Sequence, residues 1–329
     1  KESISVQLAT VGSYGNCIAS VDASNSQAKA LLSVAVHMPG EAEPKVYNVP
    51  FNSEITHGPY LGDAGFGAAK IVSRPDVSGL ELPDAITNET FIVENLVSFA
   101  GEMDQKATVA PIKYDAEGTV FDFAGATITS KANLENRSTF TGQMDVQQLA
   151  VSTEEEPNQF VLKPFKMDLK GKGDDKAMQG DYEIESGAIE ATIGTDGSLV
   201  MQSMKMAGTY AQAKGADMMI GDANGVFKDI TFTNAELSPE PIKLPELAIT
   251  SKMSQPEGTD LDITVKYAAT LDSSLMTLMQ SPVDVKTADL EVTFKALPIE
   301  AIKKYQDLMG ELASEKDQEK VAQKMQGEL

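Results

Sequence analysis

The stretch Phe165-Lys166-Met167-Asp168-Leu169 alternates apolar and charged side chains at every position. Residues 261–267 and 290–295 continue in the same way. Successive side chains of a β-strand point to opposite faces of a sheet, so a period of two is typical of strands with one buried face and one hydrated face. Because this pattern recurs along most of the chain, the sequence predicts a mainly β protein.

A weak internal repeat underlies the alternation. Similar strand-turn-strand units begin at Thr127, Lys166, Lys205 and Ala248, so that successive starts are 39, 39 and 43 residues apart. The chain has no Trp, which excludes the Trp-Asp signature of a propeller with a similar period. Stretches rich in Gly, Asn and Asp predict tight turns at residues 115–118, 194–197 and 221–225. We therefore expect an extended antiparallel sheet or a sandwich of repeated hairpins.

Helical spacing is confined to two places near the C-terminus. Residues 273–279 begin with two serines and stop before Pro282, which predicts a short helix capped by serine. From Pro298 onward, apolar residues recur every three or four positions and predict a helical C-terminal segment. These changes of pattern divide the chain into an N-terminal β region, a region of repeated hairpins and a helical segment, at residues 1–100, 101–297 and 298–329.

Composition narrows the classes of function. The chain has 329 residues, with 49 acidic against 27 basic side chains and a net charge of −22, which argues against a nucleic-acid partner because such a surface repels phosphate. A chain of this length can bury about three quarters of its unfolded surface, so its core needs no disulfide or metal. The sole cysteine, Cys17, cannot form an internal disulfide. No apolar run approaches the roughly 20 residues of a membrane-spanning helix.

The residues offer little for catalysis. His37 and His57 are the only histidines, and a triad based on histidine needs one of them. Neither a nucleophile elbow nor ligands at zinc spacing accompany them, so we expect no catalytic residue, no metal and no cofactor. A hydrolase that uses His57 stays open as an alternative.

Methionines offer one binding hypothesis. Their flexible, polarisable side chains adapt to apolar ligands, and several of the 15 in this chain fall in or beside the repeated strands. The sequence predicts an apolar groove for a lipid or acyl chain lined by Met201, Met204, Met206, Met218 and Met219. The alternative is that these side chains only fill the core.

His57-Gly58-Pro59, within residues 51–60, resembles the His-Gly-Pro signature of the YdgA-like bacterial family, a family of unknown function. Residues 111–114 and 120–125, and the passage from residues 290–294 into a helix, are similar to that family as well. The resemblance implies an inner-membrane anchor ahead of Lys1 and a periplasmic location. It brings no catalytic residues, so the role of His57, Gly58 and Pro59 stays unassigned.

The sequence thus favours a non-catalytic periplasmic envelope protein, a scaffold or binding module that holds a lipid or an envelope partner. Self-association is a further expectation, because an open sheet leaves edges that the strands of another copy can cover. A purely self-associating structural protein is the remaining alternative.

Overall fold

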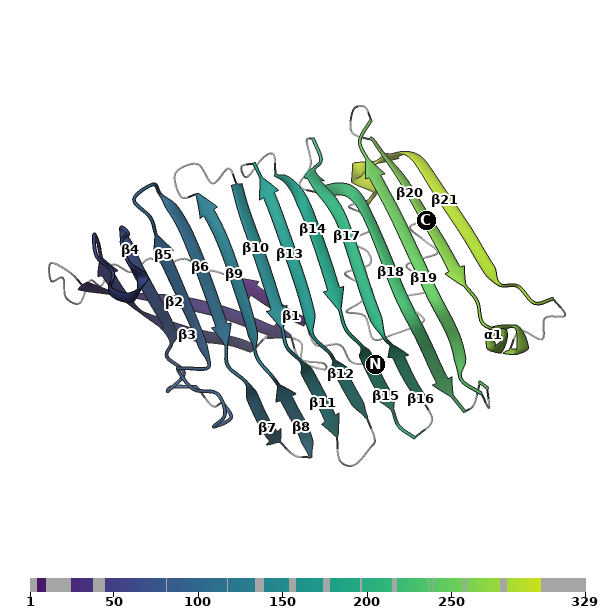
Figure 1. The fold of residues 1–329 in the computed structure, drawn as a ribbon, viewed down its shortest axis with the longest axis horizontal. Helices are drawn as coiled ribbons and strands as arrows, with labels where there is room; N and C mark the ends of the chain where they lie inside the picture. The colour runs from purple at the N-terminus through teal and green to yellow at the C-terminus, as the bar shows by residue number, and fades with distance from the viewer. Residues whose placement is uncertain are drawn as a thin grey trace.

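The computed structural model describes residues 5–9, 25–37, 45–80, 82–116, 118–133, 139–153, 158–173, 178–195, 197–214, 218–235, 237–238, 240–256, 258, 260–278 and 283–302. Within these residues, 21 strands join in one sheet, and helix is limited to short segments. All of the strand pairs are antiparallel (Figure 1). The expected mainly β fold with an extended antiparallel sheet is confirmed.

The chain passes through its elements in the following order. The N-terminal part forms β1 (Ser5–Ala9), β2 (Asn25–His37), β3 (Lys45–His57), the 3-10 turn η1 (Gly62–Ala64), β4 (Ala69–Pro75) and β5 (Phe91–Val97). The middle part forms β6 (Glu102–Val109), β7 (Ile112–Ala116), β8 (Thr119–Phe123), β9 (Ala126–Asn133), β10 (Thr139–Val146), β11 (Leu149–Thr153), β12 (Gln159–Leu162), β13 (Phe165–Lys172), β14 (Gln179–Ser186), β15 (Ile189–Ile193), β16 (Gly197–Met201) and β17 (Ser203–Gln212). The last part forms β18 (Met219–Asn234), β19 (Ile242–Ser254), β20 (Asp260–Thr270), α1 (Ser273–Leu278) and β21 (Thr287–Pro298).

The strands lie side by side in an order that follows the chain. One tier runs β1-β2-β3-β4-β5-β6-β9-β10-β13-β14-β17-β18-β19-β20-β21. The short strands β7-β8-β11-β12-β15-β16 form a second tier, which joins the same sheet at β18. In Figure 1 each short strand continues the line of a longer one. At about 4.8 Å between strands, the first tier is roughly 65 Å wide along its curve.

The register explains the internal repeat. Ile128 pairs through Met144 with Met167, Met167 pairs through Ile184 with Met206, and Met206 pairs through Gly225 with Ile249. The repeated units therefore start at the same height on every second strand. Their spacing of 39 or more residues is the length of chain that goes up and down the sheet once.

Strands slip by one residue where the tiers meet, as between β8 and β9 and between β10 and β11. Ala124 N–H donates to Gln148 O (3.0 Å), and Gln147 N–H donates to Gly125 O (3.0 Å), so two consecutive peptide groups bond to the same neighbour. In a regular strand, consecutive residues bond to opposite neighbours. The slip moves the apolar positions by one residue and so keeps them on one face of both tiers. Pro or Gly occupies this line in several strands: Pro111, Gly125, Pro164 and Gly187.

The N-terminal end of the sheet curls. Phe51 of β3 meets Phe91 of β5 with ring centroids 6.0 Å apart and planes at 90°. In a flat sheet, two strands on either side of a third lie about 10 Å apart, so the sheet bends toward the face that carries these rings. In Figure 1, β2 and β3 run behind and across the direction of β5 and β6.

The short helix α1 is confirmed, but its cap differs from the expectation. The carboxylate of Asp272 accepts the N–H of Ser274 (2.9 Å), so Asp272 and not a serine caps the helix. This hydrogen bond from the Ser274 backbone also lowers the pKa of Asp272. A single residue pattern does not show which of several adjacent polar side chains takes the cap.

The C-terminal helical segment is present only as a short turn in the described residues. Residues 299–302 are helical, and residues 303–329 lie outside the described part of the chain. Pro298 ends β21 and does not open the helix, because the alternating strand pattern runs up to it. Ile299 packs with Ala213 and Leu261 in a small buried cluster at the end of the sheet.

The structure also bears on the expected turns and on the division of the chain into three regions. Residues 221–225, expected as a turn, lie inside β18, because Gly225 pairs with Met206 and leaves room for the ring of Phe227, which a Cβ atom there would meet at 3.2 Å. At the turns expected at residues 115–118 and 194–197, the flanking strands β7 and β8, and β15 and β16, pair with each other, while residues 117 and 196 lie outside the described part of the chain. The sheet is continuous across residue 100, where β5 pairs with β6, and the three-region division stays a prediction.

The sheet has little interior. Among the described residues, seven hydrophobic side chains are buried, and only Leu261 is fully so. One face of this sheet is therefore apolar without a thick core behind it.

Candidate functional site: an apolar sheet face

Three adjacent rows of side chains on one face, which we call the apolar face, contain no Asp, Glu, Lys, Arg or His. Each row crosses ten strands, from β6 to β21, through directly paired residues. The central row is Ala107, Ile128, Met144, Met167, Ile184, Met206, Gly225, Ile249, Tyr267 and Leu290. Its neighbours are Val109, Ala126, Val146, Phe165, Ser186, Met204, Phe227, Leu247, Ala269 and Ala288, and Gln105, Ser130, Gly142, Leu169, Tyr182, Gly208, Ala223, Ser251, Val265 and Val292.

The size of the apolar face sets it apart. Ten strands by three rows, at about 4.8 Å per strand and 6.7 Å per two residues, cover roughly 960 Å². The largest apolar patch of an ordinary monomer is about 300–600 Å² and is often functional. The face therefore exceeds what a soluble chain leaves without a use.

Exposure varies along the central row of this face, where Ile128 of β9 is 37% exposed and Gly225 of β18 is buried. Ala107 of β6 is 7% exposed, whereas Tyr267 of β20 is 40% and Leu290 of β21 is 59% exposed. The curl of β3 and β4 lies at the sheltered end. Within the central row, the apolar face is thus most exposed at β20 and β21.

Two reciprocal Tyr-Gly pairs shape the middle of the apolar face. Tyr182 of β14 is paired with Gly208 of β17, and Tyr210 of β17 is paired with Gly180 of β14. Tyr210 Oη also donates to Lys170 O (3.1 Å). Because glycine has no side chain, each tyrosine ring occupies the space above its paired glycine and does not protrude from the apolar face.

The opposite face carries the charges. Lys205 Nζ contacts carboxylate oxygens of Glu183 (2.5 Å) and Glu185 (2.6 Å), and these hydrogen bonds lower the pKa of Glu185. Lys131 contacts Asp104 at 3.2 Å. A shallow hollow of about 500 Å³ beside these residues is lined largely by polar side chains of β5, β6, β9, β10 and β13. Charged side chains of both signs line this hollow, among them the paired Lys131 and Asp104, which favours a hydrated surface.

The five methionines expected to line a groove do not come together in one place. Met204 and Met206 lie on the apolar face, where Met204 pairs with Phe227. Met201 lies in the second tier, opposite Ile189. Met218 packs against the buried cluster at the end of the sheet, and Met219 begins β18. Sequence reasoning missed Met144 and Met167, which also lie on the apolar face. The signal that could have found them is their position in the internal repeat, because directly paired residues of neighbouring strands lie in one row.

His57, Gly58 and Pro59 form a tight corner between β3 and β4. His57 is exposed at the end of β3, opposite Ala69. Gly58 N–H donates to Ala68 O (2.8 Å), and a Cβ atom on Gly58 would overlap the backbone oxygen of Gly67. The corner therefore requires glycine for a close backbone approach, which gives the motif a structural use.

The tip of this corner is aromatic. The rings of Tyr60 and Phe66 lie 5.7 Å apart and are largely exposed, whereas Leu61 beneath them is buried. Lys70 of β4 reaches back to Asp63 at 3.3 Å and lowers its pKa. The corner is thus closed on itself by backbone, ring and charge contacts.

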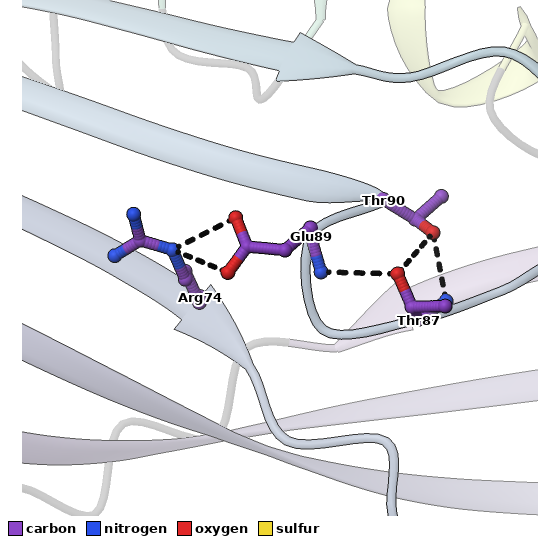
Figure 2. A network of polar contacts seen from close by, with 4 residues as sticks. All are labelled: Arg74, Thr87, Glu89 and Thr90. Atoms are coloured by element: carbon purple, nitrogen blue, oxygen red, sulfur yellow. Dashed lines mark hydrogen bonds and ion pairs between the residues drawn. The ribbon is translucent and has the colours of Figure 1, made fainter.

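The loop from β4 to β5 is also held by polar contacts (Figure 2). Arg74 Nε contacts Glu89 at 3.0 Å, and Thr87 N–H donates to the hydroxyl of the buried Thr90 (2.8 Å). These contacts tie the strand ends together on the N-terminal side of the apolar face.

Other candidate groups do not gather into a site in the described ranges. Cys17 and the acidic pair Asp174 and Asp175 lie outside the described residues. Within those residues, no three His, Cys, Asp or Glu side chains are placed to share a metal ion. In the same part of the chain, no helix has the length and apolar character needed to span a membrane.

Comparison with known proteins identifies a family. The family model described as "Bacterial protein of unknown function (DUF945)" matches residues 25–196 and again residues 167–329. Neither the curated proteins nor the solved structures contain a significant match. The expectation of a bacterial family of unknown function is confirmed, while the YdgA-like name and the membrane anchor stay predictions.

Proposed function

Because the chain belongs to the DUF945 family of bacterial proteins, whose function is unknown, we propose a function from its geometry: it is a non-catalytic module that binds acyl chains of lipids on the apolar face. The observation that carries the proposal is the run of three rows across ten strands without a charged side chain.

The chemistry of the apolar face suits flexible hydrocarbon. Aliphatic residues and methionines make up its central row except at Gly225 and Tyr267, and Gly142 lowers the row beside it. Methionine adapts to ligands without a fixed shape. Covering apolar surface gains about 25 cal/mol per Å², so an acyl chain that lies along a row is held without any specific polar contact.

The opposite face supports the same proposal. Its alternating acids and lysines, with ion pairs such as Lys131–Asp104, keep that side hydrated while the apolar face is occupied. A sheet with one hydrated and one apolar face presents lipid tails to one side only.

The proposed place of action is the bacterial envelope. We place the module in the periplasm, held at the inner membrane by a segment ahead of Lys1. The support for this location is the His57-Gly58-Pro59 resemblance and the bacterial family.

The test compares two lysine substitutions on neighbouring residues of β17. Met206→Lys places a charge in the central row of the apolar face, and Ala207→Lys places the same charge on the opposite face, in a row with Glu183. Binding of a fluorescent long-chain fatty acid to the purified, delipidated protein is measured, and native mass spectrometry reports lipid that copurifies.

We expect Met206→Lys to weaken fatty-acid binding at least tenfold, because burying a lysine ammonium group against hydrocarbon removes it from water at a high cost in free energy. We expect Ala207→Lys to bind the fatty acid as the native protein does. Met206→Gln, which is neutral and similar in length, provides an intermediate case if the lysine variant unfolds. Equal binding by all three variants, or no binding by the native protein, rules out the proposal.

A further inference from the structure

The last strand of the sheet is a long, exposed edge. β21 spans 12 residues and pairs with β20 on one side. No other described strand pairs with it. Phe294 is 50% exposed, and nearly every side chain of the strand is exposed. In Figure 1, β21 forms the right-hand border of the sheet. Such an edge presents backbone N–H and C=O groups to another strand.

Other ends of the sheet are shorter or covered. β1 and β7 are five residues each. Helix α1 covers the N-terminal end of β19, where Lys243 N–H donates to Ser274 Oγ (2.9 Å). Among the described strands, β21 is therefore the edge with the length to pair extensively.

The sequence of β21 complements itself when it is read in the opposite direction. Around Val292, Leu290 and Phe294 lie two residues to either side on the apolar face. Asp289 and Lys295 lie three residues to either side, and Lys295 comes directly before the β-bulge at Ala296, where the register with β20 shifts. On β20, Asp289 faces Ala268, whereas the intervening Glu291 already faces Lys266. Asp289 and Lys295 are both exposed, so their side chains can reach a partner across the edge.

We propose that two copies of the chain associate through β21 in an antiparallel pair centred on Val292. In this register Leu290 faces the partner's Phe294, and Asp289 faces the partner's Lys295, each contact occurring twice by symmetry. Cross-strand apolar pairs and opposite charges both stabilise antiparallel strands. The two-fold arrangement closes, so it gives a dimer and not a fibre.

Pairing through this edge continues the apolar face across both copies. Directly opposed residues of antiparallel strands lie on the same face, so the rows that end at Leu290 and Val292 continue into the second sheet. The inference goes beyond acyl binding and does not depend on it.

Charge reversal tests the proposed register. Asp289→Lys and Lys295→Asp each set like charges opposite one another, and the double variant restores opposite charges in exchanged positions. Asp168→Lys on β13 makes the same charge change far from the edge. Sedimentation velocity gives the dimer dissociation constant of each variant, and circular dichroism checks the fold.

We expect each single variant to raise the dimer dissociation constant at least tenfold. The double variant should recover most of the lost affinity, and Asp168→Lys should leave the dissociation constant unchanged. A native protein that stays monomeric at its highest soluble concentration overturns the proposal. A dimer that both single variants leave intact overturns it as well.

A zero-length carbodiimide cross-link provides a second measurement on the native protein. Asp289 and Lys295 are six residues apart on one strand, about 20 Å, so a bond between their side chains forms only between copies. Mass spectrometry of mixed light and isotope-labelled protein should show this peptide pair. Its absence from a cross-linked dimer excludes the register. Fatty-acid binding by the edge variants separates failure of the dimer from failure of the proposed function.

Discussion

Replacing Gly208 by Ala tests the register that builds the apolar face. A Cβ atom on Gly208 would overlap the backbone oxygen of Asp222 on the neighbouring strand, and it would lie 2.8 Å from the hydroxyl of Tyr182. The backbone oxygen cannot rotate away as a side chain does. The added methyl group therefore has to separate β17 from β18 or displace the ring that covers the glycine.

The expected cost follows from overpacking. Extra carbon in a filled site destabilises by about 1–3 kcal/mol. With roughly 2–3 °C of melting temperature per kcal/mol in a chain of this size, Gly208→Ala should lower the melting temperature by about 3 to 8 °C. Gly142 lies in the same row, but the nearest atom to its Cβ position is 4.0 Å away. Gly142→Ala should change stability by less than about 0.5 kcal/mol.

Urea denaturation and thermal unfolding of the two variants provide the measurement. The reasoning requires a large loss for Gly208→Ala and a small one for Gly142→Ala. If the two variants lose the same stability, the pairing of Tyr182 with Gly208 is wrong, and with it the alignment of the three apolar rows.

Three further predictions concern the periphery of the sheet. Gly58→Ala should lower the melting temperature, because its Cβ atom would overlap a backbone oxygen across the corner. Thr90→Val should cost about 1–3 kcal/mol in urea denaturation, since the N–H of Thr87 loses a buried acceptor. Because the N–H of Ser274 lowers the pKa of Asp272 below its ordinary 3.8, the cap of α1 should be complete above that pH and lost as the pH falls through the lowered pKa. Amide exchange of Ser274 follows this loss, and Asp272→Ala should abolish the pH dependence.

The alternation of side chains was enough to predict the class of fold. Each strand turns its apolar side chains toward one face of the sheet, and this alternation is local, so it is visible in a run such as residues 165–169. The repeat was visible for a related reason, because strands of equal length return to the same height after a fixed number of residues.

The methionines predicted to line a groove lie in different parts of the sheet. Met204 and Met206 lie on the apolar face, but Met218 belongs to the cluster at the sheet end. A residue type shows that a side chain suits an apolar surface, but not which surface it joins. That choice depends on pairing between strands far apart in the chain, as between Met206 and Ile184.

Local chemistry along the chain thus specifies strands, their period and the separation of apolar from charged faces. The curl that brings Phe51 to Phe91, the Tyr182–Gly208 packing and the exposed edge at β21 arise from the assembled sheet. They could not be read in advance, because each depends on the relative position of strands, and a shift of one residue in register exchanges the two faces while the composition stays the same.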